Sequence, residues 1–215
     1  MTDLRTLNNL AREYQARRQY GQALTYSRQA LEFVKDHGSE EDKASALANL
    51  GCVYWEMAQL KKAMDLFQQA LGISEEIGDG AGRAILLTIL GISYWRKCEW
   101  NEAILLMEKA LNAISENGAA ADPLPSGDEW RYHGLQEAIV RGVSTLKNRI
   151  QIARERQDPL KVLLPAFSML PLLLFTSLKE EIPDLLEEII ALAKKFKRDD
   201  ILNAIPKFQR LMVKE

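Results

Sequence analysis

The stretch LANLGCVYWEMAQLKKAMDLFQQALG, residues 47–72, returns 40 positions later as LTILGISYWRKCEWNEAILLMEKALN, residues 87–112. Tyr54 and Tyr94 hold the same place in the two copies, and Tyr14 holds it another 40 positions earlier. A fixed period of this length is typical of short units that cannot bury their apolar faces alone and therefore stack into a solenoid. The sequence thus predicts an elongated array of units rather than a globular domain.

Each copy has the pattern of two helices joined by a short turn. Apolar and small residues recur every three or four positions, which is the spacing of one helix face. In the second copy these residues are Leu47, Leu50, Gly51, Tyr54, Ala63, Phe67 and Ala70. Gly38 and Gly78 suit helix ends, and Ser39, three residues before an Asp, resembles a capping box. Residues 1–118 are therefore predicted to hold three units, at about 4–38, 44–78 and 84–118.

The succession of Leu, Gly, Tyr, Ala, Phe and Ala in residues 47–70 resembles the tetratricopeptide repeat. The first unit departs from that pattern with Ala11 in place of Gly and Ser27 in place of Phe, and the third unit has Met107 in place of Phe. The 40-residue period resembles the extended arrays of kinesin-light-chain adaptors and of many bacterial regulators. This resemblance implies an all-α fold, a right-handed α-solenoid with a divergent helical C-terminal cap.

The 40-residue register is lost after Gly118, although the chain remains rich in helical patterns. Residues 119–128 are rich in Ala, Pro and Gly and are predicted to form a loop. Helical periodicity then returns over residues 129–157, 182–196 and 201–213. We expect the first of these helices to cover the second helix of the third unit. Residues 129–215 would then continue the solenoid as a divergent helical region.

An apolar segment at residues 160–178 allows two interpretations. It is short for a membrane span and contains Pro165 and Pro171. The amphipathic helix that follows it is suited to cover it. We therefore favour a buried helix of a degenerate unit over a peripheral membrane or partner-helix contact, and we do not expect membrane contact.

Composition excludes several classes of function. The chain has 28 Lys and Arg against 30 Asp and Glu, a balance that argues against nucleic acid as the main partner. Two Cys and two His, with no glycine-rich phosphate loop and no nucleophile motif, predict that the chain is not an enzyme and has no catalytic residue, cofactor or metal site. The first residues lack the basic start and apolar run of a secretory signal, which predicts a cytoplasmic protein with reduced thiols.

The resemblance also implies where a partner protein would bind. In tetratricopeptide arrays, the first helix of each unit turns its free side toward a concave groove. The matching positions, called the groove residues below, are Asn9, Arg12, Gln15, Asn49, Cys52, Trp55, Glu56, Ile92, Trp95 and Arg96. Trp55 and Trp95 lie 40 residues apart on this surface. A Trp beside an Arg or Asn is the composition of a binding hot spot.

Two functions fit these groove residues. In the first, an open groove binds a peptide or helix of a partner protein, and the chain is an adaptor or scaffold. In the second, the C-terminal helices of the chain fill the groove or a small ligand binds there, and the chain is a regulatory or sensor module. The two tryptophans do not decide between them, because aromatic stripes on helices more often belong to a core.

Overall fold

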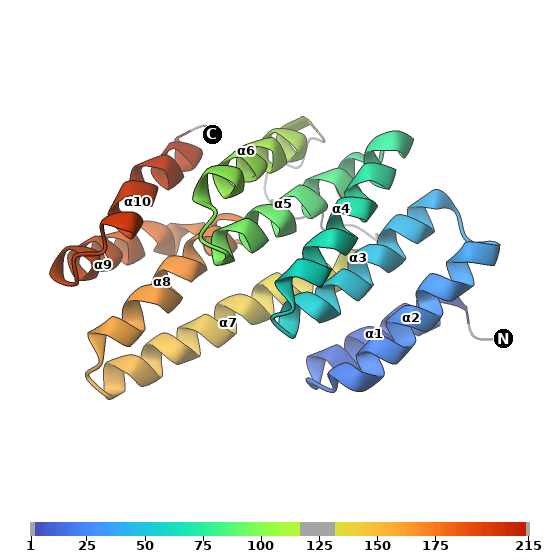
Figure 1. Ribbon diagram of the computed structural model, residues 1–215, viewed down its shortest axis with the longest axis horizontal. Helices are drawn as coiled ribbons and strands as arrows, with labels where there is room; N and C mark the ends of the chain where they lie inside the picture. Colours follow the sequence, from blue (N-terminus) through green and yellow to red (C-terminus); the bar gives the residue numbers. More distant parts are fainter. Residues whose placement is uncertain (1–2, 117–131, 214–215) are drawn as a thin grey trace.

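The computed structural model describes residues 3–116 and 132–213, and all regular structure within these ranges is helical (Figure 1). The first six helices are α1 (Leu4–Ala16), α2 (Tyr20–His37), α3 (Glu40–Glu56), α4 (Leu60–Ile77), α5 (Gly80–Arg96) and α6 (Trp100–Glu116). After the gap come α7 (His133–Glu155), α8 (Pro159–Leu174), a 3-10 turn (Lys179–Glu181), α9 (Ile182–Lys195) and α10 (Asp199–Met212). The predicted all-α solenoid is confirmed. The loop expected at residues 119–128 lies outside the described residues.

Consecutive helices pack in antiparallel pairs, and the first three pairs stack into an array. α1 packs on α2, α3 on α4 and α5 on α6, while α2 meets α3 and α4 meets α5 between the pairs. In the second and third pairs, a glycine lets the two helices approach each other closely. A Cβ atom on Gly51 would lie 2.7 Å from the ring of Phe67, and one on Gly91 would lie 2.9 Å from Cγ of Met107. Phe67 and Met107 are fully buried and cannot retreat, so packing requires glycine at both positions.

The predicted signals at the helix ends have two different outcomes. The capping box is confirmed, since Ser39 Oγ accepts a hydrogen bond from Asp42 N at 3.1 Å and Asp42 Oδ2 accepts one from Ser39 N at 3.2 Å. Gly78 ends α4 in the left-handed conformation, with φ of 71°. Gly38 ends α2 in extended backbone instead, and glycine is needed there because a Cβ atom would lie 2.6 Å from Cβ of Val34.

One tight turn is repeated between the two helices of every described pair. Its left-handed residues are Arg18, Ala58, Cys98, Gln157 and Lys197, with φ between 52° and 62°. In the first turn, Gln19 N donates to Tyr14 O at 2.8 Å. The same bond, to the carbonyl five residues back, closes the fourth turn, where Asp158 N donates to Ala153 O at 2.9 Å. Gln157 and Lys197 are again 40 residues apart, so α7–α8 and α9–α10 share the turn and the period of the first three pairs.

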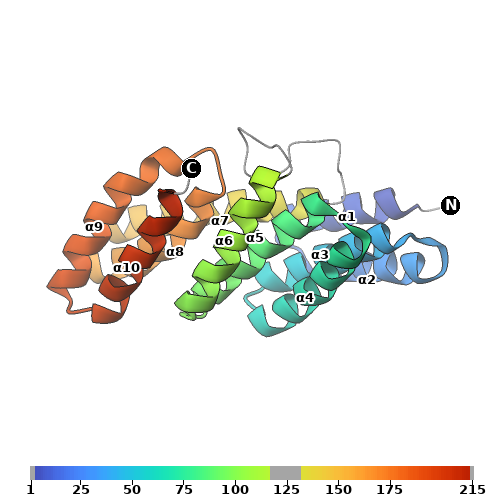
Figure 2. The same cartoon turned by 90° about the horizontal axis from the view of Figure 1, so that it is seen from above.

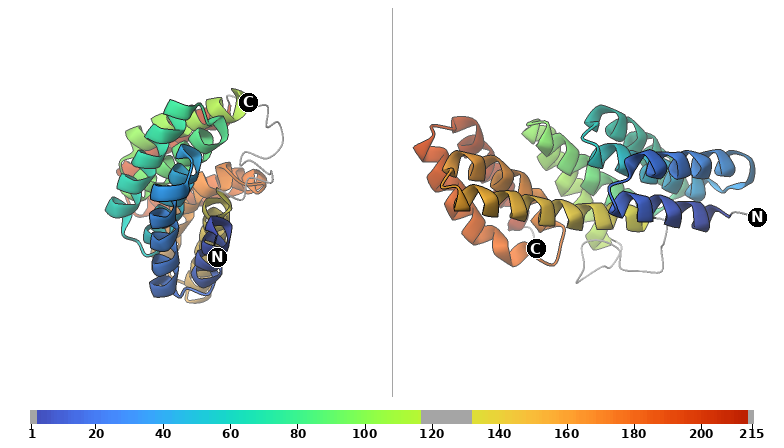
Figure 3. Two further views of the ribbon diagram at one scale, coloured as in Figure 1. Left: turned by 90° about the vertical axis from the view of Figure 1, so that its right-hand side faces the viewer. Right: turned by 90° about the horizontal axis from the view of Figure 1, so that it is seen from below.

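The α7–α8 pair does not stack on α6 as the earlier pairs stack on one another. α7 packs on α3 and α8 packs on α5, so both lie on the inner side of the array when it is seen end-on (Figure 3). α10 packs on α6 (Figure 2). The expectation that the helix at 129–157 covers the second helix of the third unit was therefore wrong. That helix is turned onto the inner face, and α10 takes its place on α6.

The apolar segment at residues 160–178 is mostly a core helix. Within α8, Leu163, Ala166 and Leu170 have no exposed surface, and Pro165 and Pro171 lie inside the helix. Among the described residues, no helix is both long enough and apolar enough to cross a membrane. The buried interpretation of this segment is the one that the structure shows.

A glycine pair tests the close helix contact. Gly51→Leu should lower the free energy of unfolding by about 2 to 4 kcal/mol, because the new side chain would overlap the buried Phe67 ring. Gly72→Ala, in α4 with nothing within 4 Å of a new Cβ atom, should raise it by about 0.5 to 1 kcal/mol. Denaturant unfolding followed by circular dichroism measures both changes. A Gly51→Leu chain as stable as the wild type would contradict the contact.

Candidate partner-binding groove

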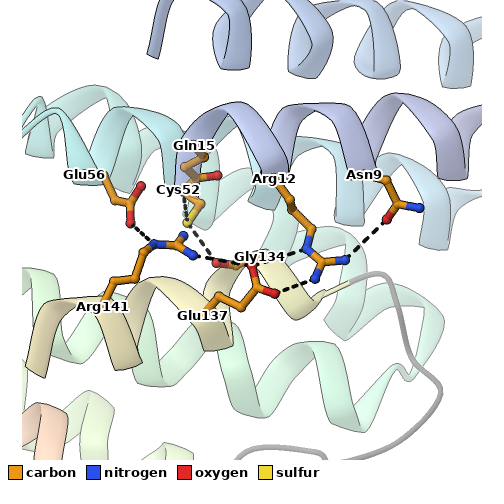
Figure 4. A network of polar contacts seen from close by, with 8 residues as sticks. All are labelled: Asn9, Arg12, Gln15, Cys52, Glu56, Gly134, Glu137 and Arg141. Atoms are coloured by element: carbon orange, nitrogen blue, oxygen red, sulfur yellow. Dashed lines mark hydrogen bonds and ion pairs between the residues drawn. The ribbon is translucent and has the colours of Figure 1, made fainter. Parts of the chain in front are cut away.

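The inner side of the array is occupied by α7, and polar groove residues of the first unit contact it. Arg12 forms an ion pair with Glu137 of α7, and its Nε donates to Glu137 Oε2 at 3.3 Å. Asn9 Oδ1 accepts a hydrogen bond from Arg12 Nη1, also at 3.3 Å, and holds the guanidinium in place (Figure 4). Asn9 is exposed and Arg12 is partly exposed, so water reaches this end of the contact.

The second unit contacts α7 through a buried thiol. Gln15 of the first unit donates to Cys52 Sγ at 3.1 Å, and that thiol donates to Gly134 O of α7 at 3.4 Å. Asn49 lies beside the same glycine, where a Cβ atom would be 3.0 Å from Asn49 Oδ1. The absence of a side chain at Gly134 therefore lets the first turn of α7 lie directly on α3. Burial raises the pKa of Cys52 to about 12, so the thiol is neutral and serves as a donor.

A chain of alternating charges fixes the middle of α7. Arg141 Nε donates to Glu56 Oε1 at 2.8 Å, and Arg141 Nη1 lies 3.4 Å from Glu137 Oε2, so that Arg12, Glu137, Arg141 and Glu56 alternate in sign. Burial acts to raise the pKa of Glu137, but its hydrogen bonds and charge interactions with Arg12 and Arg141 outweigh burial and lower it. Burial likewise opposes the charge of Arg141, and Glu56 outweighs it, so the pKa of Arg141 is raised.

The two tryptophans of the groove are buried. Trp95 is 2% exposed, its Nε1 donates to Phe167 O of α8 at 3.0 Å, and its ring lies 4.7 Å from the Phe167 ring, centroid to centroid. Trp55 is 4% exposed and lies beneath the guanidinium of Arg96, which is 4.5 Å from its ring centroid. A Cβ atom on Gly142 of α7 would lie 3.7 Å from the Trp55 ring. The C-terminal helices thus cover both tryptophans.

The structure brings the groove residues together along one surface but leaves them unequally accessible. Gln15, Asn49, Cys52, Trp55, Ile92 and Trp95 are buried, Arg12, Glu56 and Arg96 are partly exposed, and Asn9 is exposed. Their contacts in α7 and α8 were not identified from the sequence. Those contacts are Gly134, Glu137, Arg141 and Phe167. The Glu137–Arg141 spacing of four was the one available signal, and such pairs are common on solvated helix faces.

Comparison with known proteins identifies the repeat in the first part of the chain. A family model described as tetratricopeptide repeat matches residues 2–76. Those residues carry the tetratricopeptide repeat. No curated protein matches the chain at a significant level.

Solved structures show a similar arrangement over most of the chain. The structure of BtubC (BKLC) from P. vanneervenii is 13% identical with a TM-score of 0.52, and the match covers 96% of this chain and 78% of that one. The putative kinesin light chain with nearly identical TPR-like repeats from Podosopora anserina is 20% identical with a TM-score of 0.49, over 91% of this chain and 97% of that one. At such identities the likeness concerns the tetratricopeptide fold alone.

The groove presents side chains that can form hydrogen bonds, ion pairs and apolar contacts. Its groups are guanidinium, carboxylate, amide, indole and a neutral thiol. In the part of the chain that the structure describes, no three His, Cys, Asp or Glu residues are grouped so that they could hold a metal ion.

The contact between α7 and the tetratricopeptide units can be followed through its thiol. Cys98 is exposed and should react at once with a chromogenic disulfide reagent at neutral pH, whereas Cys52 is buried and has a pKa of about 12, so it should react only as fast as the structure opens. Reaction kinetics measure the two phases, and Cys98→Ser should remove the fast phase alone. Equal rates for the two thiols in the wild type would show that α7 does not cover Cys52.

Proposed function

We propose that this tetratricopeptide protein is a protein-interaction adaptor of a regulated kind. Its concave groove binds a helix or peptide of a partner, and its own C-terminal helices compete for that groove. The observation that carries the proposal is that α7 uses Arg12, Cys52 and Glu56, three residues expected to hold a partner. α7 lies along the groove, where a partner helix is proposed to bind, and it makes the contacts that a partner helix would make.

The covering helices are attached with unequal strength along the groove. On the third unit, α8 is fixed by a desolvated aromatic cluster in which Trp95 contacts Phe167. On the first unit, α7 depends on the Arg12–Glu137 pair, whose side chains are 26% and 40% exposed. Partly exposed pairs contribute only about 1 kcal/mol or less each. Displacement of α7 would therefore begin at the first unit.

Apolar contacts of α7 oppose its displacement. Leu135 and Ile139 have no exposed surface. Exposing such side chains costs about 1.5 to 3 kcal/mol each, so thermal motion alone populates the open state rarely. A partner that places its own apolar side chains at these positions recovers this energy. The proposed partner is therefore a protein segment with an apolar stripe, and neither a nucleic acid nor a small substrate to be turned over.

The cellular compartment is part of the same proposal. Cys52 is a buried free thiol that donates a hydrogen bond to the backbone of α7, and Cys98 is an exposed free thiol. Both features suit the reducing conditions of the cytoplasm, where we place this protein. Fluorescence microscopy of the tagged chain tests the placement.

Charge reversal on α7 tests the competition. In Glu137→Lys/Arg141→Glu, like charges face each other at Arg12 and at Glu56, so α7 should detach from the first two units. We expect this variant to capture partner proteins that the wild type captures weakly, and to expose Cys52 to the disulfide reagent. Affinity capture with quantitative mass spectrometry measures the first effect and thiol kinetics the second.

Two further variants distinguish specific binding in the groove from non-specific binding to an exposed apolar surface. Adding Arg12→Glu and Glu56→Arg to the reversed chain restores every opposite-charge pair and should return both readouts to wild-type values. Adding Trp55→Ala to the reversed chain instead should weaken the captured complexes by about 2 kcal/mol, roughly thirtyfold. A captured set that is the same in all variants would place partner binding elsewhere on the protein.

A further inference from the structure

A cavity of about 370 Å³ lies where the ends of the inner helices meet α7 and α8. Four arginines from separate parts of the chain line it: Arg18 in the α1–α2 turn, Arg96 at the end of α5, and Arg141 and Arg149 on α7. Trp55 and Leu172 give it an apolar side, and Glu56 is the one acidic residue in its lining. We call it the arginine cavity.

The arginines exceed the negative charge available to them. Glu56 and Glu137 both pair with Arg141, while Arg18, Arg96 and Arg149 form no ion pair with any described residue. Burial lowers the pKa of Arg96, and the neighbouring charge of Arg149 lowers it further. Arg96 is partly buried, whereas Arg149 and Arg18 are exposed, so two neighbouring positive charges lie where the protein meets solvent. Such a pair of like charges favours a bound anion.

Helix C-termini could offset the charge of the arginines, but the partial charge that they carry is too small to do so completely. α1, α3 and α5 end near the cavity, and each helix C-terminus carries about half a negative charge that arginine could offset. Three such ends, Glu56, and the part of the Glu137 charge that Arg141 shares with Arg12 offset roughly three of the four arginine charges. A positive excess of about one charge is left.

Three polar atoms of residues that line the cavity lack hydrogen-bond partners, although each atom has almost no accessible surface. Arg141 Nη2, Glu56 Oε2 and Trp55 Nε1 are buried and make no hydrogen bond within the described part of the chain. Buried polar groups are nearly always paired with protein or with something bound beside them. The guanidinium and the indole can donate to an oxyanion, whereas the Glu56 carboxylate can only accept and needs a donor.

We propose that the arginine cavity binds a small, multiply charged oxyanion, a compound that carries phosphate groups or several carboxylates. Guanidinium groups match both kinds of oxyanion through paired N–H donors. The volume suits a metabolite-sized ligand rather than a protein side chain. Such a ligand would connect α7 to the α1–α2 turn and to the end of α5. Anion binding to the free chain can be tested whether or not a partner protein displaces α7.

Calorimetric titration of the full chain with pyrophosphate, and separately with citrate, tests the proposal at constant ionic strength. We expect saturable binding of one ligand per chain, and the tighter of the two anions identifies phosphate or polycarboxylate as the preferred chemistry. Arg96→Gln/Arg149→Gln should weaken binding by about a hundredfold, about tenfold for each charged hydrogen-bonding group removed.

Three controls decide how that loss is interpreted. Arg149→Lys keeps the charge without the paired donors and should bind with intermediate affinity. Arg156→Gln removes an exposed charge at the end of α7, outside the cavity lining, and should bind like the wild type. Circular dichroism establishes that each variant is folded. Absence of saturable binding of either anion to the wild type, or an equal loss in Arg156→Gln, would overturn the proposal.

Discussion

The inner helix of the third unit has no polar side, and the closed form of the protein follows from that. From Ala84 to Ser93, every residue of α5 is buried. A helix that is apolar all round belongs inside a core and cannot present one side to a water-filled groove. One side of α5 is covered by α4 and α6, and α8 covers the side that faces the groove. Closure at the third unit is thus a packing requirement.

The inner face becomes more apolar from the first unit to the third. α1 places Asn9 and Arg12 there, α3 places Asn49 and Cys52, and α5 places Ile92. Contacts with the covering helices change in the same order, from hydrated ion pairs to a dry aromatic cluster. A ligand can compete where the cover is held by polar groups, because water and a new partner both satisfy those groups. At the third unit, the loss of apolar burial has no such compensation.

The sequence predicted the three regular pairs because their period is carried by residues that packing requires, such as Gly51 against Phe67. It did not predict two more pairs with the same period. Their turns depend on left-handed backbone at Gln157 and Lys197. Neither residue is a glycine, so the residue type does not reveal the turn. For the groove, the sequence left two occupants open, a partner or the C-terminal helices, and it did not identify the residues of α7 and α8 that contact this surface. Glu137 and Arg141 have an ordinary surface pattern until Arg12 and Glu56 are placed opposite them.

The two proposed sites share residues, and because of this the two proposed ligands should oppose each other's binding. Glu56 and Arg141 belong both to the charge chain that holds α7 on the array and to the wall of the arginine cavity. The cavity exists only while α7 lies on α3, because Arg141 and Arg149 are carried by α7. An oxyanion bound there stabilises the covered groove, and a partner that displaces α7 removes two of the four arginines. Linkage makes this antagonism reciprocal, so each ligand lowers the affinity of the other by the same factor. On these two proposals, the C-terminal helices convert the level of a small anion into the availability of a tetratricopeptide groove.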